Sequence, residues 1–119
     1  METTILGTES IVAELSRALD LVELRHSVYA SNIANASTDG YRRMEVVVNG
    51  MVSPIASELD AGGVGLPAGE VVPSANATVR LDQEMAQMSQ NAIRFQQLIG
   101  AFERTTGLLR MAIHEGRGG

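Results

Sequence analysis

Apolar residues recur every three or four positions through the first third of the chain, which is the spacing of one helix face. This pattern predicts a helix over residues 9–36, with no proline inside it and with Thr8 or Ser10 able to cap its start. The side chains expected to form an intramolecular seam against another helix are Leu15, Leu19, Val22, Tyr29 and Ile33.

The last third shows the same spacing more regularly and predicts a second helix over residues 81–114. Asp82 and Glu84 at its start, and basic residues at its end, suit the helix dipole. The seam expected on this helix contains Met85, Met88, Phe95, Ile99 and Phe102.

Residues 37–80 lack helical periodicity and are rich in glycine and proline between Ala61 and Pro73. They predict an irregular segment with one or two short strands, at Met44–Gly50 and at Glu70–Val72. A segment of this length could join the helices in either relative direction. The length of 119 residues favours a single domain.

Each predicted helix carries a second apolar stripe beside its seam. A lone two-helix hairpin needs one stripe on each helix, so a second stripe indicates packing against other chains. The hairpin alone should therefore be marginally stable. Gly100 and Gly107 are either tolerated weak points or places where a neighbouring backbone comes close. The expected assembly contacts are Leu98, Gly100, Ala101, Gly107, Leu108 and Leu109.

Composition narrows the function further. The net charge of −5 without a basic face argues against nucleic-acid binding, and the absence of cysteine excludes thiolate catalysis and Cys-based zinc sites. No apolar run reaches the ~20 residues that span a bilayer, and the N-terminus lacks the pattern of a cleaved signal peptide. No catalytic, cofactor or metal motif is present, so we expect no enzyme activity, no cofactor and no small-molecule substrate.

The junction after the first helix, SNIANASTDGYRR, has the chemistry of a helix stop and turn. Asn35 and Gly40 tolerate positive φ, and Thr38 can bond nearby backbone groups. The wider pattern AxNIANxxTxGYxR resembles the N-terminal signature of bacterial flagellar axial proteins. It places Asn32, Ile33, Ala34, Asn35, Thr38, Gly40 and Tyr41 in the family motif. Asp39 departs from the proline that is common in this family.

Three C-terminal stretches, Val79–Ala86, Asn91–Gln96 and Gly107–Ile113, resemble the small proximal rod subunit FlgB, with the related subunit FlgC as second candidate. The resemblance covers both ends, and the middle looks shorter than usual. It implies an all-α fold in which the terminal helices form an antiparallel coiled-coil hairpin around the irregular middle.

The resemblance also implies a structural role in the flagellar basal body. The chain would be exported by the flagellar type III apparatus, without a cleaved signal peptide, and would build the periplasmic proximal rod. The implied partners are copies of itself, other rod subunits, the rod–MS-ring adaptor and the export gate. The alternative is a non-polymerising helical adaptor or export chaperone of a secretion system.

Overall fold

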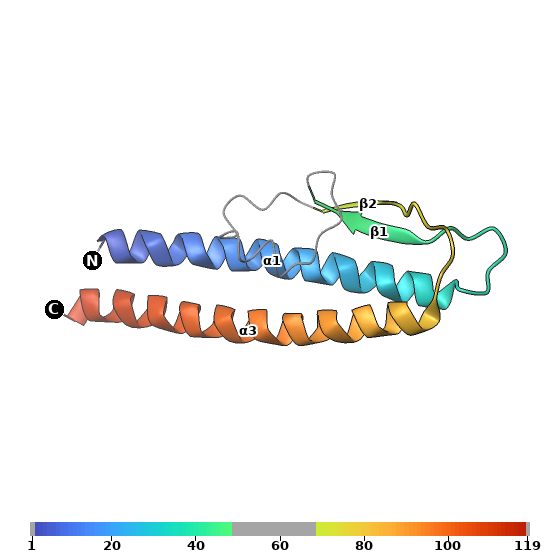
Figure 1. Cartoon of the computed structure of the whole chain (residues 1–119). Coiled ribbons are helices and arrows are strands. Elements are labelled where there is room, and N and C mark those ends of the chain that lie inside the picture. Colours follow the sequence, from blue (N-terminus) through green and yellow to red (C-terminus); the bar gives the residue numbers. More distant parts are fainter. Residues whose placement is uncertain (1, 49–68, 119) are drawn as a thin grey trace.

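A computed structural model describes residues 2–48 and 69–118 of the chain. The elements follow in the order α1 (Glu2–Ala34), β1 (Met44–Val47), β2 (Glu70–Pro73) and α3 (Leu81–Gly118). The two helices run antiparallel along the length of an elongated molecule of 65 × 23 × 18 Å, so that both termini lie at one end (Figure 1). The predicted helical hairpin with short strands in its middle is confirmed.

Both helices are longer than the sequence pattern predicts. α1 begins at Glu2 instead of residue 9 and contains Gly7, and α3 continues to Gly118 instead of ending at residue 114. A single interior glycine costs only about 1 kcal/mol, which neighbouring helical turns can tolerate. α1 ends at Ala34, two residues before the predicted boundary, because the backbone turns at the motif.

The strands form a two-stranded antiparallel sheet, in which Met44 pairs with Pro73 and Val47 pairs with Glu70. Both strands fall where the sequence pattern predicts them. The glycine- and proline-rich stretch that was predicted to be irregular falls largely within residues 49–68, which lie outside the described residues.

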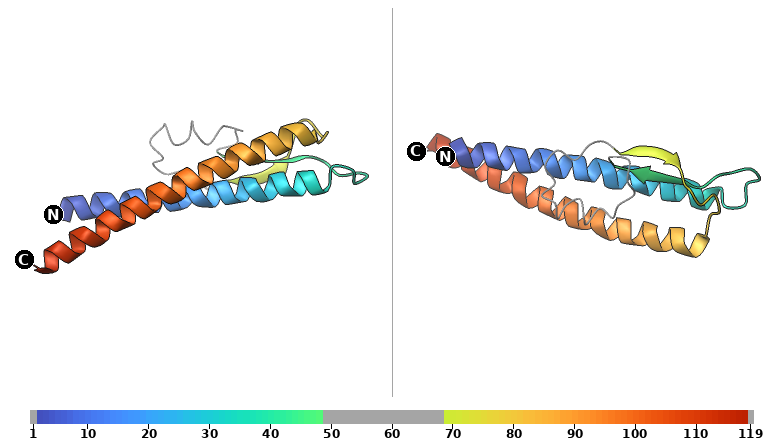
Figure 2. Two further views of the ribbon diagram at one scale, coloured as in Figure 1. Left: turned by 90° about the horizontal axis from the view of Figure 1, so that it is seen from below. Right: turned by 45° about the horizontal axis from the view of Figure 1, so that its top comes forward.

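α1 is the central element, because it contacts α3 on one side and β1 on another. Figures 1 and 2 show the sheet lying along the half of α1 that is distant from the termini, while the helices cross at a shallow angle. The hydrophobic core joins all three layers and consists of Ala18, Leu21, Val22, Val28, Val46, Val48 and Leu98.

The sheet approaches α1 closely at Gly69. A Cβ atom at this position would lie 2.7 Å from Leu21 Cδ1 and 2.8 Å from Val46 Cγ1, both closer than ordinary contact. Glycine here lets the chain enter β2 directly over the α1 side chains. This packing gives half of the hairpin a third layer, whereas among the described residues the other half consists of the two helices alone.

Candidate functional site

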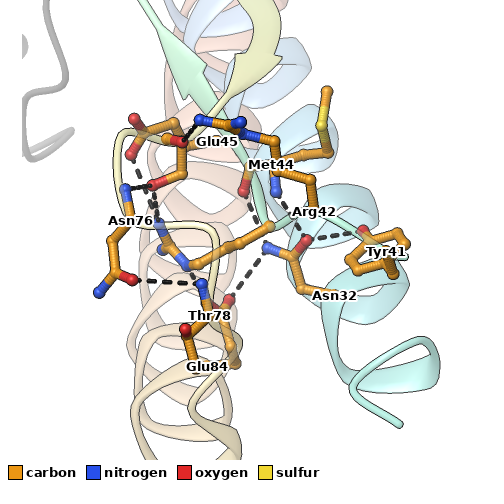
Figure 3. A network of polar contacts seen from close by, with 10 residues as sticks. Asn32, Tyr41, Arg42, Met44, Glu45, Asn76, Thr78 and Glu84 are labelled. Carbon is orange, nitrogen blue, oxygen red and sulfur yellow. Dashed lines mark hydrogen bonds and ion pairs between the residues drawn. The ribbon is translucent and has the colours of Figure 1, made fainter. Parts of the chain in front are cut away.

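A polar cluster closes the end of the hairpin that lies opposite the termini. It joins the end of α1, the chain entering β1, the chain leaving β2 and the first turn of α3 (Figure 3). Its central residues are Asn32, Arg43, Ser74 and Glu84, and we call this set the polar cluster. Three of these side chains are buried: Asn32 is 0%, Glu84 1% and Ser74 3% exposed.

Asn32 uses its whole amide. Its Nδ2 donates to the carbonyl oxygen of Met44 at 2.8 Å and to Oε2 of Glu84 at 3.3 Å. Its Oδ1 accepts from the Tyr41 hydroxyl at 2.7 Å and from the Met44 backbone N–H at 3.0 Å. Two donors and two acceptors are the full capacity of an amide side chain. Asn32 therefore fastens α1 to β1 and to α3 with no unpaired polar atom.

Arg43 and Glu84 form an ion pair across the same cluster. Arg43 Nε donates to Glu84 Oε1, and Arg43 also reaches Ser74 Oγ at 3.0 Å and Glu45 Oε2 at 3.4 Å. Burial by itself lowers the pKa of Arg43, but the hydrogen bond and charge of Glu84 reverse this, so the pKa is raised. A buried carboxylate is costly unless it is paired, and here it has two donors.

Ser74 links the cluster to the chain that leaves β2. Its backbone N–H donates to the carbonyl oxygen of Arg43 at 2.8 Å, and its hydroxyl accepts from the Asn76 N–H at 3.2 Å. Arg42 adds a bond to the Ser74 carbonyl oxygen at 3.2 Å. Among the described residues, no buried side-chain nitrogen or oxygen lacks a hydrogen-bond partner. The buried polar atoms of the cluster are therefore all paired within the described residues, and these bonds hold the four chain segments together.

The motif turn itself is built from short-range bonds. Asn35 Nδ2 donates to the Ser31 carbonyl oxygen, and the Thr38 hydroxyl donates to Asn35 Oδ1. The Tyr41 N–H then bonds the Thr38 carbonyl oxygen, and Gly40 has a φ of +78°. A positive φ at the third position of a four-residue turn is the pattern of a type II turn, in which proline is favoured at the second position. Asp39 occupies that second position.

Replacing Asp39 with proline should therefore stabilise the chain. Proline fixes the φ that this turn position requires and reduces the freedom of the unfolded chain, for a gain of about 0.4–1 kcal/mol. Urea unfolding followed by circular dichroism would measure this gain. Asp39→Ala is the control and should change stability by less than Asp39→Pro; a destabilised Asp39→Pro variant would show that the turn has another backbone form.

The predicted motif residues do not share one environment. Asn32 and Tyr41 join the polar cluster, whereas Asn35, Thr38 and Gly40 shape the turn. Ile33 is half-buried and Ala34 is exposed. The motif thus combines a buried anchor with a surface turn.

The seam on α3 agrees with the predicted one at every second residue. At the residues between, the observed position lies one place earlier in the sequence. The helix buries or half-buries Glu84, Met88, Asn91, Phe95, Leu98, Phe102, Thr105, Leu109 and Ala112, and we call this set the observed seam. Met85 is 58% exposed, so its assignment to the intramolecular seam is wrong. Met88, Phe95 and Phe102 do lie on the observed seam, and Ile99 is half-buried at its edge.

Two polar residues explain the displaced seam. Glu84 is buried through the polar cluster, and Asn91 is 6% exposed with its Nδ2 donating to the Val22 carbonyl oxygen at 2.8 Å. A search for apolar periodicity passes over such residues, because their burial depends on partners elsewhere in the chain. The signal available in the sequence was the seven-residue spacing of Glu84, Asn91 and Leu98, which places the three residues on one face of the helix.

The seam on α1 lies closer to the prediction. Val22 is 1% exposed, Leu15 and Leu19 pack at the border of the core, and Tyr29 and Ile33 are half-buried. Burial raises the pKa of the Tyr29 phenol, the charge of Arg25 opposes this, and the charge of Glu84 adds to the rise. This environment favours the neutral phenol.

The predicted assembly residues divide into two groups. Leu98 is 5% exposed and belongs to the hydrophobic core, so its prediction as a contact for other chains is corrected. Leu108 is 63% exposed, and a Cβ atom at Gly107 would meet nothing within 4 Å among the described residues. A Cβ atom at Gly100 would lie nearest the Arg104 side chain, at 3.3 Å from Nη1, and Ala101 and Leu109 are half-buried.

The half of the hairpin near the termini has no core of its own. We call residues 7–17 of α1 and 99–116 of α3 the open half. Among its described side chains none is buried. Its exposed large apolar side chains are Ile11 (49%), Leu108 (63%), Met111 (61%) and Ile113 (41%). Two helices without a third layer cannot cover the apolar side chains that lie outside their mutual contact.

The described residues offer no support for other kinds of site. They contain no group of three or more His, Cys, Asp or Glu side chains placed to hold a metal ion. Within the same residues, neither helix is long and apolar enough to cross a membrane.

Comparison with known proteins adds one finding. Residues 15–42 match the family model described as Flagella basal body rod protein. The match spans the second half of α1 and the turn up to Arg42, and so includes Asn32 and Tyr41. No curated protein matches the chain. The motif segment is therefore similar to the flagellar basal body rod protein family, and this similarity is confined to residues 15–42.

Proposed function

We propose that this chain is a structural subunit of the bacterial flagellar proximal rod, which transmits torque and encloses the export channel. The open half is the observation that carries the proposal, because its apolar side chains are covered only when other chains pack against them. The family match at residues 15–42 supports a rod structural role in general.

The finer assignment rests on the C-terminal resemblance. The stretches around Glu84, Asn91 and Leu109 favour the FlgB type of subunit over the FlgC type. In this role the chain contacts copies of itself, other rod subunits, the rod–MS-ring adaptor and the export gate. It reaches the periplasmic rod through the flagellar type III apparatus and is required for flagellum assembly and motility.

Assembly can be separated from folding by substituting Leu108. Leu108→Asp places a charge on the open half, and should abolish swimming when the variant is the cell's sole source of the protein. The variant should be missing from purified basal bodies. Purified Leu108→Asp should keep the helical circular dichroism of the parent, because the Leu108 side chain is 63% exposed.

Gln96→Asp is the matched control. It introduces the same charge at an exposed position on the same helix, outside the open half, and should leave motility intact. Full motility and normal incorporation of Leu108→Asp would refute a contact through the open half.

The alternative function is a helical adaptor or export chaperone that binds a partner helix and never polymerises. The exposed apolar stripe would also suit such a partner. Cell fractionation distinguishes the two functions. A rod subunit is found in basal bodies after detergent extraction, whereas an adaptor stays in the soluble fraction. Finding the parent protein only in the soluble fraction would favour the adaptor.

A further inference from the structure

α3 has two overlapping faces that could pack against α1. Both contain Met88, Phe95, Phe102 and Leu109. The observed seam completes this shared row with residues that include Glu84 and Asn91. The other face, which we call the apolar face, completes it with Leu81, Met85, Ala92, Ile99, Thr106 and Ile113. Since one residue turns a helix by 100°, the two faces differ by a rotation of roughly 50°.

If apolar burial alone decided the packing, the apolar face of α3 would pack against α1, but in the structure this face is largely exposed. Leu81 is 47% and Met85 58% exposed, and Ala92 is also exposed. The corresponding positions on the observed seam, Glu84 and Asn91, are 1% and 6% exposed. Burying large apolar side chains is worth about 1.5–3 kcal/mol each, whereas buried polar groups at best compensate for lost water. Another interaction must therefore fix the rotation of α3.

Three hydrogen bonds that join α3 to α1 and to the chain before β1 depend on that rotation. Asn91 Nδ2 donates to the Val22 carbonyl oxygen of α1 at 2.8 Å. About two helical turns earlier, Glu84 accepts from Asn32 at the end of α1 and from Arg43 before β1. Rotating α3 until Met85 and Ala92 replace Glu84 and Asn91 would separate all three pairs. Buried polar residues that fix one arrangement of paired helices, at some cost in stability, are well attested.

We propose that Glu84 and Asn91 are rotational anchors, which select the face of α3 that packs on α1 and hold the apolar face outward. Without the anchors, the apolar face closes against α1. This inference concerns the chain by itself and does not depend on the rod assignment.

A thiol-labelling experiment can test the anchors, because the chain contains no cysteine. The reporter Ala92→Cys lies on the apolar face and is exposed in the parent. It is compared in the parent and in the double variant Glu84→Ala/Asn91→Ala, which removes both anchors without adding large apolar side chains to the observed seam. We expect maleimide labelling of the reporter to slow by about tenfold in the double variant, because the position becomes protected by packing.

Ala86→Cys is the matched control on the same helix. It is exposed and lies away from both faces, so its labelling rate should be the same in both backgrounds. The proposal is overturned if the double variant keeps its helical circular dichroism while Ala92→Cys labels at the parent rate. Loss of helix content in the double variant also overturns it, since the apolar face would then be unable to close the hairpin.

Discussion

Replacing Leu98 with aspartate is expected to unfold the hairpin, whereas the same replacement at Leu108 leaves it folded. Leu98 is 5% exposed and packs in the core that joins α1, β1 and α3. A carboxylate there would be buried without a partner, in a space shaped for an apolar side chain, at a cost above about 4 kcal/mol. Leu108 is 63% exposed, so Leu108→Asp costs only about 0.5 kcal/mol of helix propensity.

Circular dichroism during thermal unfolding measures both variants on one scale. Leu98→Asp should show little helix at 25 °C, and Leu108→Asp should melt within a few degrees of the parent. The pair also separates two causes of lost motility, since Leu98→Asp acts through folding and Leu108→Asp through assembly. A cooperatively folded Leu98→Asp variant would place Leu98 outside the core and restore it as an assembly contact.

Replacing Arg43 with alanine is expected to destabilise the chain by about 3 kcal/mol. The substitution removes the ion pair with Glu84, whose side chain is only 2% exposed, and the bond to Ser74 Oγ. Among the described residues of the polar cluster, Asn32 then remains as the neutral donor to that carboxylate. The free energy of unfolding in urea measures the loss.

Arg42→Ala is the matched control, because Arg42 is the adjacent arginine but is exposed. It makes a single bond at 3.2 Å to the Ser74 carbonyl oxygen, so its loss should cost less than about 1 kcal/mol. Adding Glu84→Gln to Arg43→Ala should recover part of the loss, since the neutral amide needs no counter-ion. Equal losses for Arg42→Ala and Arg43→Ala would show that the buried pair has no special weight.

The helices and strands could be predicted from local pattern alone. Apolar spacing located both helices, and the short runs of valine at Val46 and Val71 located the strands. The helix ends were less predictable, because a single residue such as Gly7 lowers helix propensity without determining where the helix stops.

Only part of the polar cluster could be predicted from the sequence. Asn32 and Tyr41 were found through the motif, while Glu84 was interpreted as a residue that suits the helix dipole. Its partners Arg43 and Asn32 are 41 and 52 positions away along the chain. No local pattern connects residues that far apart, so their pairing could not be inferred.

The sequence by itself determined that this protein is a pair of long amphipathic helices with more apolar surface than a hairpin can bury, and with a turn motif similar to that of the rod family. Only the tertiary structure decided which face of α3 meets α1, because that choice depends on buried hydrogen bonds from Glu84 and Asn91 to distant groups. It also decided that Leu98 is core and Leu108 is surface, because Leu98 lies on the observed seam that faces α1 and Leu108 lies outside that seam. The spacing of apolar residues shows that a helix packs against a partner. The position of the partner decides which face of the helix is buried.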